Sequence, residues 1–272
     1  MKPVSLLKEL IDNRALIWKL SWNDFKKRYA GSYLGFAWAL VPPVVTVLMY
    51  WFVFDIFFGQ KAQLVKEGIE LPYVVYLTAG LVPWFFFTEA LQQATNALLE
   101  YVFLVKQVVF KISILPLIKV TAAVFVHAFF IVVMLAVAAV YGMYPSIYTL
   151  QIFYYGFCLF ILVLGISYAT SAVVVFFRDL SHLIQVGLQI GMWATPILWN
   201  INNVASHKKL TFVLELNPMC YIVNGYRDAV AGTAWFWQDL SGTMYFWGFT
   251  IVTFVIGAFV FKRLKVHFAD VL

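Results

Sequence analysis

Residues 122–140 read AAVFVHAFFIVVMLAVAAV, a run of 19 residues in which His127 is the one polar side chain. A helix rises 1.5 Å per residue, so about 20 apolar residues cross the ~30 Å hydrocarbon core of a bilayer. A strand of a membrane β-barrel would alternate apolar and polar residues over about ten positions. Residues 122–140 do not alternate, and the stretch therefore predicts a membrane-spanning helix.

The composition of the whole chain agrees with this interpretation. Of the 272 residues, 63% are apolar and 12% are charged, and the mean hydropathy is +0.86. A soluble domain carries roughly 25% charged residues. Most of the outer surface must therefore contact something other than water, and lipid is the solvent that we expect.

Six stretches have the length and the apolar character of a membrane span. Irregular backbone is not tolerated in lipid, so each stretch is expected to be a helix. The stretches are 34–58, 73–99, 113–141, 152–177, 183–199 and 242–261. The sequence thus predicts an all-α integral membrane protein with six transmembrane helices between residues 34 and 261. We expect residues 1–272 to form a single domain that ends in a tail over 262–272.

The distribution of Lys and Arg predicts the orientation of these spans. Cytoplasmic loops of membrane proteins carry an excess of Lys and Arg. If the N-terminus lies in the cytoplasm, 14 of the 19 Lys and Arg residues fall on the inner side, seven of them within residues 1–30. Both termini are therefore expected in the cytoplasm. The net charge of +6 follows from this asymmetry, and we do not take it as a sign of nucleic-acid binding.

Residues 1–30 precede the first span and differ from it in pattern. Apolar residues such as Trp18 and Trp22 recur close to the helical period, and Lys8, Lys19 and Lys26 occupy other faces. A basic amphipathic helix with Trp on its apolar side typically lies in the plane of the membrane interface. The alternative is a surface helix packed on a soluble core, but no such core is visible in the sequence. We therefore predict an N-terminal amphipathic interfacial helix.

Residues 200–240 form the longest segment expected on the outer side. They contain Asn217-Pro218, Gly225 and Gly232 among apolar and aromatic residues. An apolar segment of this length is seldom a structureless loop. We expect short re-entrant outer helices before the last span, since backbone at that depth is tolerated where protein or a water-filled cavity covers it.

The sequence contains none of the common motifs of nucleotide hydrolysis, zinc proteolysis or serine hydrolysis. A phosphate-binding loop needs Gly-Lys-Ser/Thr, and no glycine in this chain is followed by lysine. His-Glu-x-x-His and Gly-x-Ser-x-Gly are also absent. The sequence therefore predicts a non-catalytic chain without a cofactor or a metal site of its own.

Ionisable residues inside the predicted spans are candidates for function, because each is costly in hydrocarbon. Glu89 lies well inside the second span, where Gln92, Gln93 and Asn96 extend a polar stripe at helical spacing. The stripe favours a water-facing surface, such as the lining of a channel. The alternative is that these side chains form hydrogen bonds between helices that serve packing alone. For His127 we favour this packing interpretation.

Arg178 and Asp179 lie at the cytoplasmic end of the fourth predicted span. Adjacent opposite charges of this kind can pair with neighbouring helices or with a partner protein. They can also form a solvated helix end with a snorkelling arginine.

Four places in the chain, taken in order, resemble a known family. They are RYAGSYLGFAW at 28–38; LVK at 104–106 with Phe110 and ILP at 114–116; FRDL at 177–180 with TPILW at 195–199; and NP at 217–218 with YR at 226–227 and Gly232. Together they make the chain resemble the membrane (permease) subunits of ATP-binding-cassette exporters of polysaccharides and polyol phosphates, such as the O-antigen and teichoic-acid export permeases. The likeness covers nearly the whole chain.

The resemblance implies a homodimer that forms one channel in the bacterial inner (plasma) membrane. Two separate nucleotide-binding ATPase subunits would bind ATP and Mg on the cytoplasmic side, and the substrate would be a lipid-linked polysaccharide of the kind used in lipopolysaccharide biosynthesis. It implies a cytoplasmic gate of Tyr29, Gly31, Ser32, Tyr33, Leu34 and Gly35. It implies contacts with the ATPase subunit through Leu104, Val105, Lys106, Phe110, Lys111, Arg178 and Asp179. It implies an outer gate with Asn217, Pro218, Tyr221, Tyr226 and Arg227. Possible channel-lining residues are those of the polar stripe together with Trp38: Glu89, Gln92, Gln93, Asn96 and Trp38.

Other functions remain open at this stage. Within transport, the chain could export teichoic acid or capsular polysaccharide, or it could be a permease for a small drug or a lipid. An intramembrane enzyme such as a glycosyltransferase is the alternative from another class. It would need clustered carboxylates or a metal site, whereas the intramembrane charges here are dispersed.

Overall fold

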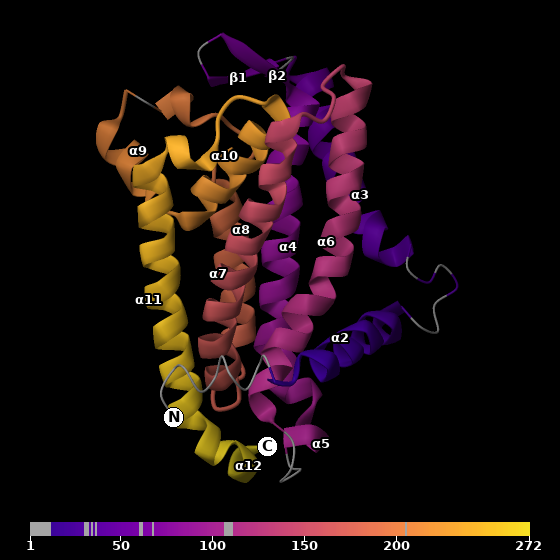
Figure 1. Cartoon of the computed structure of the whole chain (residues 1–272), viewed down its shortest axis with the longest axis vertical. Helices are drawn as coiled ribbons and strands as arrows, with labels where there is room; N and C mark the ends of the chain where they lie inside the picture. The colour runs from indigo at the N-terminus through magenta and orange to yellow at the C-terminus, as the bar shows by residue number, and fades with distance from the viewer. Residues whose placement is uncertain are drawn as a thin grey trace.

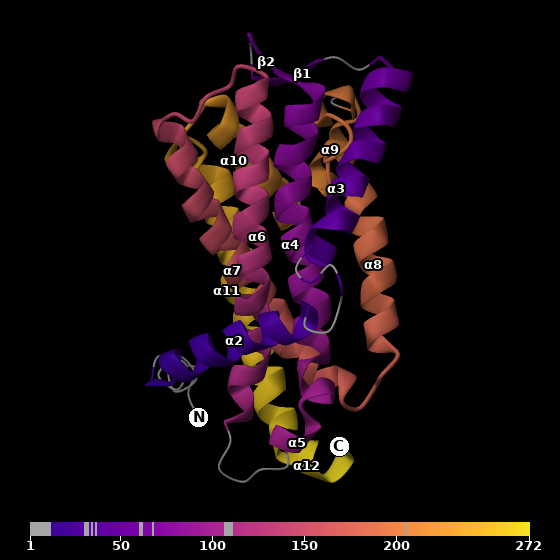
Figure 2. The ribbon, with the colours of Figure 1, turned by 90° about the vertical axis from the view of Figure 1, so that its right-hand side faces the viewer.

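A computed structural model describes residues 12–29, 33, 35, 37–59, 62–66, 68–105, 111–204 and 206–272. Within these ranges the chain forms an elongated bundle of helices (Figures 1 and 2). We call each long helix of the bundle, with any turn that continues it, a pass. The six passes are α3 (Ala37–Trp51) with the π-helical turn η1 (Phe52–Phe57), α4 (Tyr73–Glu100), α6 (Leu115–Val140), α7 (Gln151–Val174), α8 (Leu180–Ala194) and α11 (Leu240–Leu264).

Five of these passes have the length and the apolar character needed to cross a membrane. Among the described residues they are 37–57, 73–100, 112–140, 147–174 and 240–267, with hydropathies from 1.5 to 2.8. They correspond to the first four expected spans and to the last one. The prediction of an all-α integral membrane protein is therefore confirmed.

The helix at the fifth expected span is shorter than predicted. α8 has 15 residues and ends at Ala194, whereas the sequence predicted a span to Trp199. Thr195 adopts an extended conformation because the proline at 196 disfavours a helical conformation in the residue before it. At 1.5 Å per residue α8 is about 22 Å long, shorter than the hydrocarbon core. Six complete crossings thus stay a prediction.

The segment before the last pass contains the two short helices that the sequence predicted. They are α9 (Lys208–Glu215) and α10 (Pro218–Ala231). α10 begins with Asn217, whose side chain accepts a hydrogen bond from the backbone N–H of Met219, and with proline at the first helical position. It ends at Gly232, whose φ of +70° is the left-handed conformation of a helix C-cap.

A small β-hairpin was not predicted by the sequence analysis. Strands β1 (Ala62–Lys66) and β2 (Ile69–Pro72) pair antiparallel, and Gly68 between them has a φ of +81°. The hairpin covers one end of the bundle, where it contacts α4 and α10 (Figure 1). We call this the hairpin end.

The opposite end carries the first described helix, α2 (Arg14–Tyr29), which lies across the bundle axis (Figure 2). The short helices α5 (Val102–Val105) and α12 (Phe268–Val271) lie at the same end. We call it the α2 end. Short 3-10 turns complete the fold: η2 (Ile112–Ile114), η3 (Ile147–Leu150), η4 (Ile201–Val204), η5 (Phe236–Gln238) and η6 (Lys265–His267).

The core of the bundle forms around α4. Twenty of its 28 residues are buried, and it packs against α6, α7, α8 and α10. By contrast α3, described in full, buries none of its residues, and α8, also described in full, buries Leu188 alone. Because α3 and α8 are largely apolar, their uncovered faces suit lipid or another protein surface rather than water.

Candidate functional site

The polar stripe on α4 divides between two neighbouring faces of the helix. Glu89 and Gln93 are four residues apart and face α2, where Arg28 donates a hydrogen bond from Nη1 to Glu89 Oε1 at 2.6 Å and another from Nη2 to Gln93 Oε1. The ion pair between Arg28 and Glu89 matches the hydrogen-bonding alternative that the sequence left open. A role of Glu89 and Gln93 in lining a channel stays a prediction.

The contact between α2 and the bundle continues through a second set of charges. Lys119 on α6 donates to Asp24 Oδ1 at 2.7 Å and also to Glu100, and the Tyr101 hydroxyl donates to Asp24 Oδ1 at 2.5 Å. The side chains of Asp24 and Lys119 are 7% and 5% exposed. We call Asp24, Arg28, Glu89, Gln93, Glu100, Tyr101 and Lys119 the α2 network. The sequence analysis assigned no role to Asp24, Tyr101 or Lys119, although the i, i+4 spacing of Asp24 and Arg28 was a signal.

The surroundings of Asp24 change its pKa. Burial alone would raise the pKa, but hydrogen bonds from Lys119 and Tyr101 and the charges of Lys119 and Arg28 outweigh burial and lower the pKa below the ordinary value of 3.8. Asp24 is therefore an ionised and paired carboxylate at neutral pH. Its ion pair with Lys119 connects α2 to α6, and the hydrogen bond from Tyr101 connects α2 to the end of α4.

The other face of the stripe, Gln92 and Asn96, points toward α8. Asn96 Oδ1 accepts a hydrogen bond from the Ser181 hydroxyl at 2.7 Å. Gln92 lines a cavity of about 230 Å³ together with Gln185 and Gln189 of α8. The other residues around this cavity are Trp84, Thr88, Leu188 and Met192. We call Thr88, Gln92, Gln185 and Gln189 the amide surface.

The amide surface is unusual for its position in the bundle. It lies between α4 and α8, in a part of the chain where uncovered helix faces are apolar. Amide and hydroxyl groups there offer donors and acceptors to a polar molecule. The sequence analysis missed Gln185 and Gln189, although their i, i+4 spacing on a predicted span was a usable signal.

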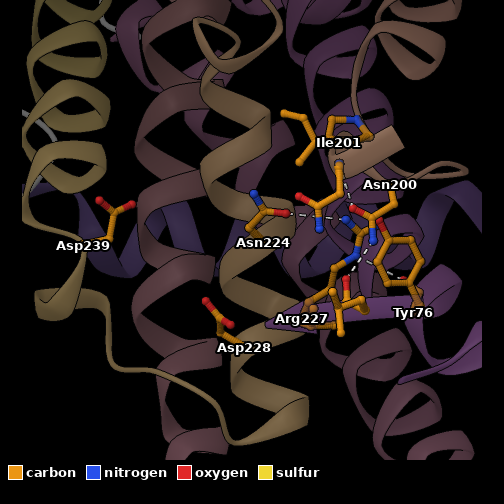
Figure 3. Close-up of a pocket in the computed structure, with 11 residues that line it drawn as sticks. Tyr76, Asn200, Ile201, Asn224, Arg227, Asp228 and Asp239 are labelled. Atoms are coloured by element: carbon orange, nitrogen blue, oxygen red, sulfur yellow. Dashed lines mark hydrogen bonds between the residues drawn. The ribbon is translucent and has the colours of Figure 1, made fainter. Parts of the chain in front are cut away.

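A larger cavity of about 300 Å³ lies at the hairpin end (Figure 3). Its wall includes Tyr76 of α4, Asn200, and Asn224, Arg227 and Asp228 of α10. Arg227 is 2% exposed, and its guanidinium carbon lies 3.5 Å from the centre of the Tyr76 ring. Its Nη2 donates to the Ile197 carbonyl at 3.0 Å. Arg227 thus connects α4, the turn after α8, and α10.

Three other residues of the predicted outer gate form hydrogen bonds with neighbouring segments: Asn217, Tyr221 and Tyr226. Asn217 donates to the Thr195 hydroxyl at 2.8 Å, and Tyr221 pairs with the Thr243 hydroxyl at 2.8 Å. Tyr226 is buried, and its hydroxyl lies 2.8 Å from Nε2 of His127. The contact of His127 agrees with the packing role that we favoured for it. Whether these residues gate a channel stays a prediction.

The predicted cytoplasmic gate and ATPase contacts lie at the α2 end where the structure describes them. Tyr33 is fully exposed, Gly35 has a φ of +51°, and Trp38 is half exposed at the start of α3. Leu104 and Val105 belong to α5, Lys111 is exposed, and Arg178 and Asp179 occupy the exposed turn before α8. Gly31, Ser32, Leu34, Lys106, Phe110 and the side chain of Tyr29 lie outside the described residues.

The apolar helices, the polar surface between two of them and the exposed turns at one end together define a multi-pass membrane protein of the transporter class. Comparison with known proteins makes the class specific. The chain belongs to the ABC-2 type transporter family, whose sequence model matches residues 15–231. This confirms the resemblance stated from the sequence to membrane subunits of ATP-binding-cassette exporters.

Curated proteins with similar sequences carry the name O-antigen export system permease protein RfbA. One from Klebsiella pneumoniae is 29% identical over 257 residues, which are 92% of each chain. A second from the same organism is 28% identical over the same share. One from Myxococcus xanthus is 26% identical over 224 residues, 82% of this chain and 83% of its own.

Proposed function

We propose that this chain is the channel-forming subunit of an exporter that moves a lipid-linked polysaccharide of the O-antigen type across the bacterial inner membrane. Two copies would form one channel. Two separate ATPase subunits would dock on the α2 end, which is then the cytoplasmic side, and would bind ATP and Mg. In this division of labour the chain itself is not catalytic, and residues 1–272 act as one domain.

The observation that carries this proposal is the amide surface between α4 and α8. A polysaccharide displays many hydroxyl groups, and each loses hydrogen bonds to water when the polymer enters a membrane. Gln92, Gln185 and Gln189 supply both donors and acceptors to replace them. Trp84, in the wall of the same cavity, offers an aromatic ring to the apolar C–H faces of sugars.

The exposure of α3 and α8 supports a channel formed between two copies. A single copy leaves the amide surface at the side of α8, where lipid would meet the glutamines. Polar groups facing lipid are costly, whereas a second copy could enclose them around a hydrated passage. The names of the relatives that match 82–92% of the chain support the O-antigen class of polysaccharide as the substrate.

A deletion strain tests the proposal. Without this gene, surface polysaccharide should disappear and lipid-linked polymer should accumulate inside the cell, and the wild-type gene should restore export. A double variant with Gln92→Leu and Gln189→Leu should lower export about 30-fold, because each of the two lost hydrogen bonds is worth about 1 kcal/mol. Gln63→Leu on the hairpin removes an amide outside the cavity and serves as the control.

Two results would contradict the proposal. One is normal surface polysaccharide in the deletion strain, or export of a small drug or a lipid instead. The other is ATP hydrolysis by the purified chain without a partner, since we assign that reaction to a separate subunit.

A further inference from the structure

The cavity at the hairpin end has a smaller neighbour. The volumes of the two cavities are about 300 and about 130 Å³, and Asn224, Asp228 and Asp239 line both. Since the two spaces share part of their wall, we treat them as one site, the double cavity. The larger part falls at the lower end of the ~300–1,000 Å³ range of ligand pockets.

The side chain of Arg227 lies buried in this wall. None of the ion pairs found among the described residues includes Arg227. Its hydrogen bonds run to the carbonyls of Tyr76 (3.4 Å) and Ile197 (3.0 Å) and to Asn224 Oδ1 (3.5 Å). A guanidinium has five N–H donors, so within the described part of the chain two of them lack an acceptor. Buried arginines without a charged partner are rare, which suggests a ligand with acceptor oxygens.

The carboxylates in the same wall limit the charge of that ligand. Figure 3 shows Asp239 on one side of the view, Arg227 and Asn200 on the other, and Asp228 and Asn224 between them. A phosphate would meet Arg227 but would be repelled by the two carboxylates. A metal ion would be attracted by the two carboxylates but repelled by Arg227. A neutral molecule with several hydroxyl groups can donate to the carboxylates and accept from the guanidinium at the same time.

Aromatic rings in the smaller part of the double cavity favour a sugar among such molecules. Tyr155, Tyr221 and Trp235 line it beside Gln238. An aromatic ring gives a large apolar contact at low entropic cost and keeps a polar tip for hydrogen bonding. A pyranose has apolar C–H faces and a rim of hydroxyl groups, so it matches a wall that alternates rings with amides and carboxylates.

We propose that the double cavity is a binding site for one or two neutral sugar units of the transported polymer. This inference rests on the proposed function and adds a site to it. The site belongs to a single copy of the chain and is separate from the amide surface. It would hold the polymer at the side where the polymer leaves, and so would oppose its return.

Direct binding to the full chain in lipid nanodiscs tests the site. Saturation-transfer NMR with glucose, galactose, mannose and N-acetylglucosamine should detect saturable binding of at least one of them. Asn224→Leu removes an exposed amide from the shared wall, and Asn202→Leu removes another from the larger part. Each should weaken binding about tenfold, as expected for a site that loses a hydrogen bond to a sugar hydroxyl. Asn203→Leu, exposed next to Asn202 but outside the wall, should bind as the wild type does.

The inference is overturned if none of the four sugars binds, or if both cavity variants bind like the Asn203→Leu control. Displacement of the sugar by millimolar phosphate or by calcium would also overturn it, because it would mark an ion site. The deletion strain separates this inference from the proposed function. If export is lost in the deletion strain but no sugar binds to the chain, the binding site is refuted and the proposed function stands. If a sugar binds but export does not need the chain, the proposed function falls.

Discussion

Charged residues at the α2 end pair across long distances in the sequence. Asp24 and Lys119 are 95 residues apart, and Arg28 and Glu89 are 61 apart. Burying two opposite charges costs desolvation, and the pair persists because each charge satisfies the other. Any movement of α2 relative to α4 and α6 would break these pairs. The α2 network therefore couples the position of α2 to that of the bundle.

Lys119→Met tests how much this network stabilises the fold. The substitution leaves the carboxylate of Asp24 buried with its main partner gone, and breaking a buried pair in this way costs about 3–5 kcal/mol. We expect a clear drop in the thermal unfolding temperature of the detergent-purified chain. Lys111→Met, which removes an exposed lysine, is the matched control. Equal unfolding temperatures for the two variants would show that the pair contributes nothing.

The pKa of Asp24 predicts a dependence of stability on pH. A carboxyl whose pKa is lowered in the folded state contributes stability above its unfolded pKa, and that stability is lost as pH falls through the folded pKa. Since the folded pKa lies below 3.8, the full contribution should be present at neutral pH. The difference in unfolding temperature between the wild type and Asp24→Asn should shrink as pH drops below about 4. A constant difference from pH 7 to pH 3 would contradict this.

At the level of whole helices, α7 and α11 pack through glycines. A Cβ built on Gly257 would lie 2.2 Å from the carbonyl oxygen of Gly165, and one on Gly165 would lie 3.0 Å from the backbone of Phe254. Small residues allow helix backbones to approach closely in membranes, where the hydrophobic effect does not drive association. Close van der Waals contact at these glycines thus positions α11 against α7, together with the hydrogen bond that Trp247 Nε1 donates to the Tyr154 hydroxyl at 3.1 Å.

Gly257→Ala should therefore destabilise the chain, although alanine favours helix formation by about 1 kcal/mol over glycine. The added methyl group overlaps a backbone atom that cannot rotate away, and overpacking of this kind costs about 1–3 kcal/mol. Gly248→Ala on the same helix meets open space and should be neutral or slightly stabilising. Thermal unfolding of both variants measures the effect. A Gly257→Ala variant as stable as Gly248→Ala would mean that α7 and α11 separate at little cost.

At the scale of the whole molecule, we propose that an ATPase subunit docks on the α2 end. The exposed turn with Arg178 and Asp179 and the helix α5 lie at this end (Figures 1 and 2). Membership of the ABC-2 type transporter family implies an ATP-binding partner. A ligand shifts a conformational equilibrium only through its preference for one state. Contacts that change between the ATP-bound and ATP-free partner must therefore lie on such a surface.

Arg178→Ala and Asp179→Ala should reduce the ATPase activity of the assembled complex about two- to fivefold, the effect of losing one exposed ion pair. Membrane insertion should be unaffected, because both side chains are exposed. The measurement is ATP hydrolysis by the purified complex, with insertion checked by fractionation. Lys262→Ala, an exposed substitution on the last helix, serves as a comparison. Unchanged activity in both variants would remove the turn from the mechanism.

The sequence by itself determined the class of the fold and most of its spans. The stretch expected at 73–99 is the helix Tyr73–Glu100, and the one expected at 242–261 lies within Leu240–Leu264. These predictions held because the length of an apolar run and the need for internal backbone hydrogen bonds in lipid are local properties. The short helices before the last span were foreseen for a similar reason, from Asn217-Pro218 and Gly232.

Tertiary structure alone decided what the polar residues of the spans contact. From the sequence, Glu89, Gln92, Gln93 and Asn96 form one stripe, but packing turns Glu89 and Gln93 to Arg28 and turns Gln92 and Asn96 to α8. The double cavity likewise joins residues from β1, α4, α10 and the segments around them. Such contacts join segments far apart in the chain, and hydropathy contains no information about which distant segment covers a given face of a helix.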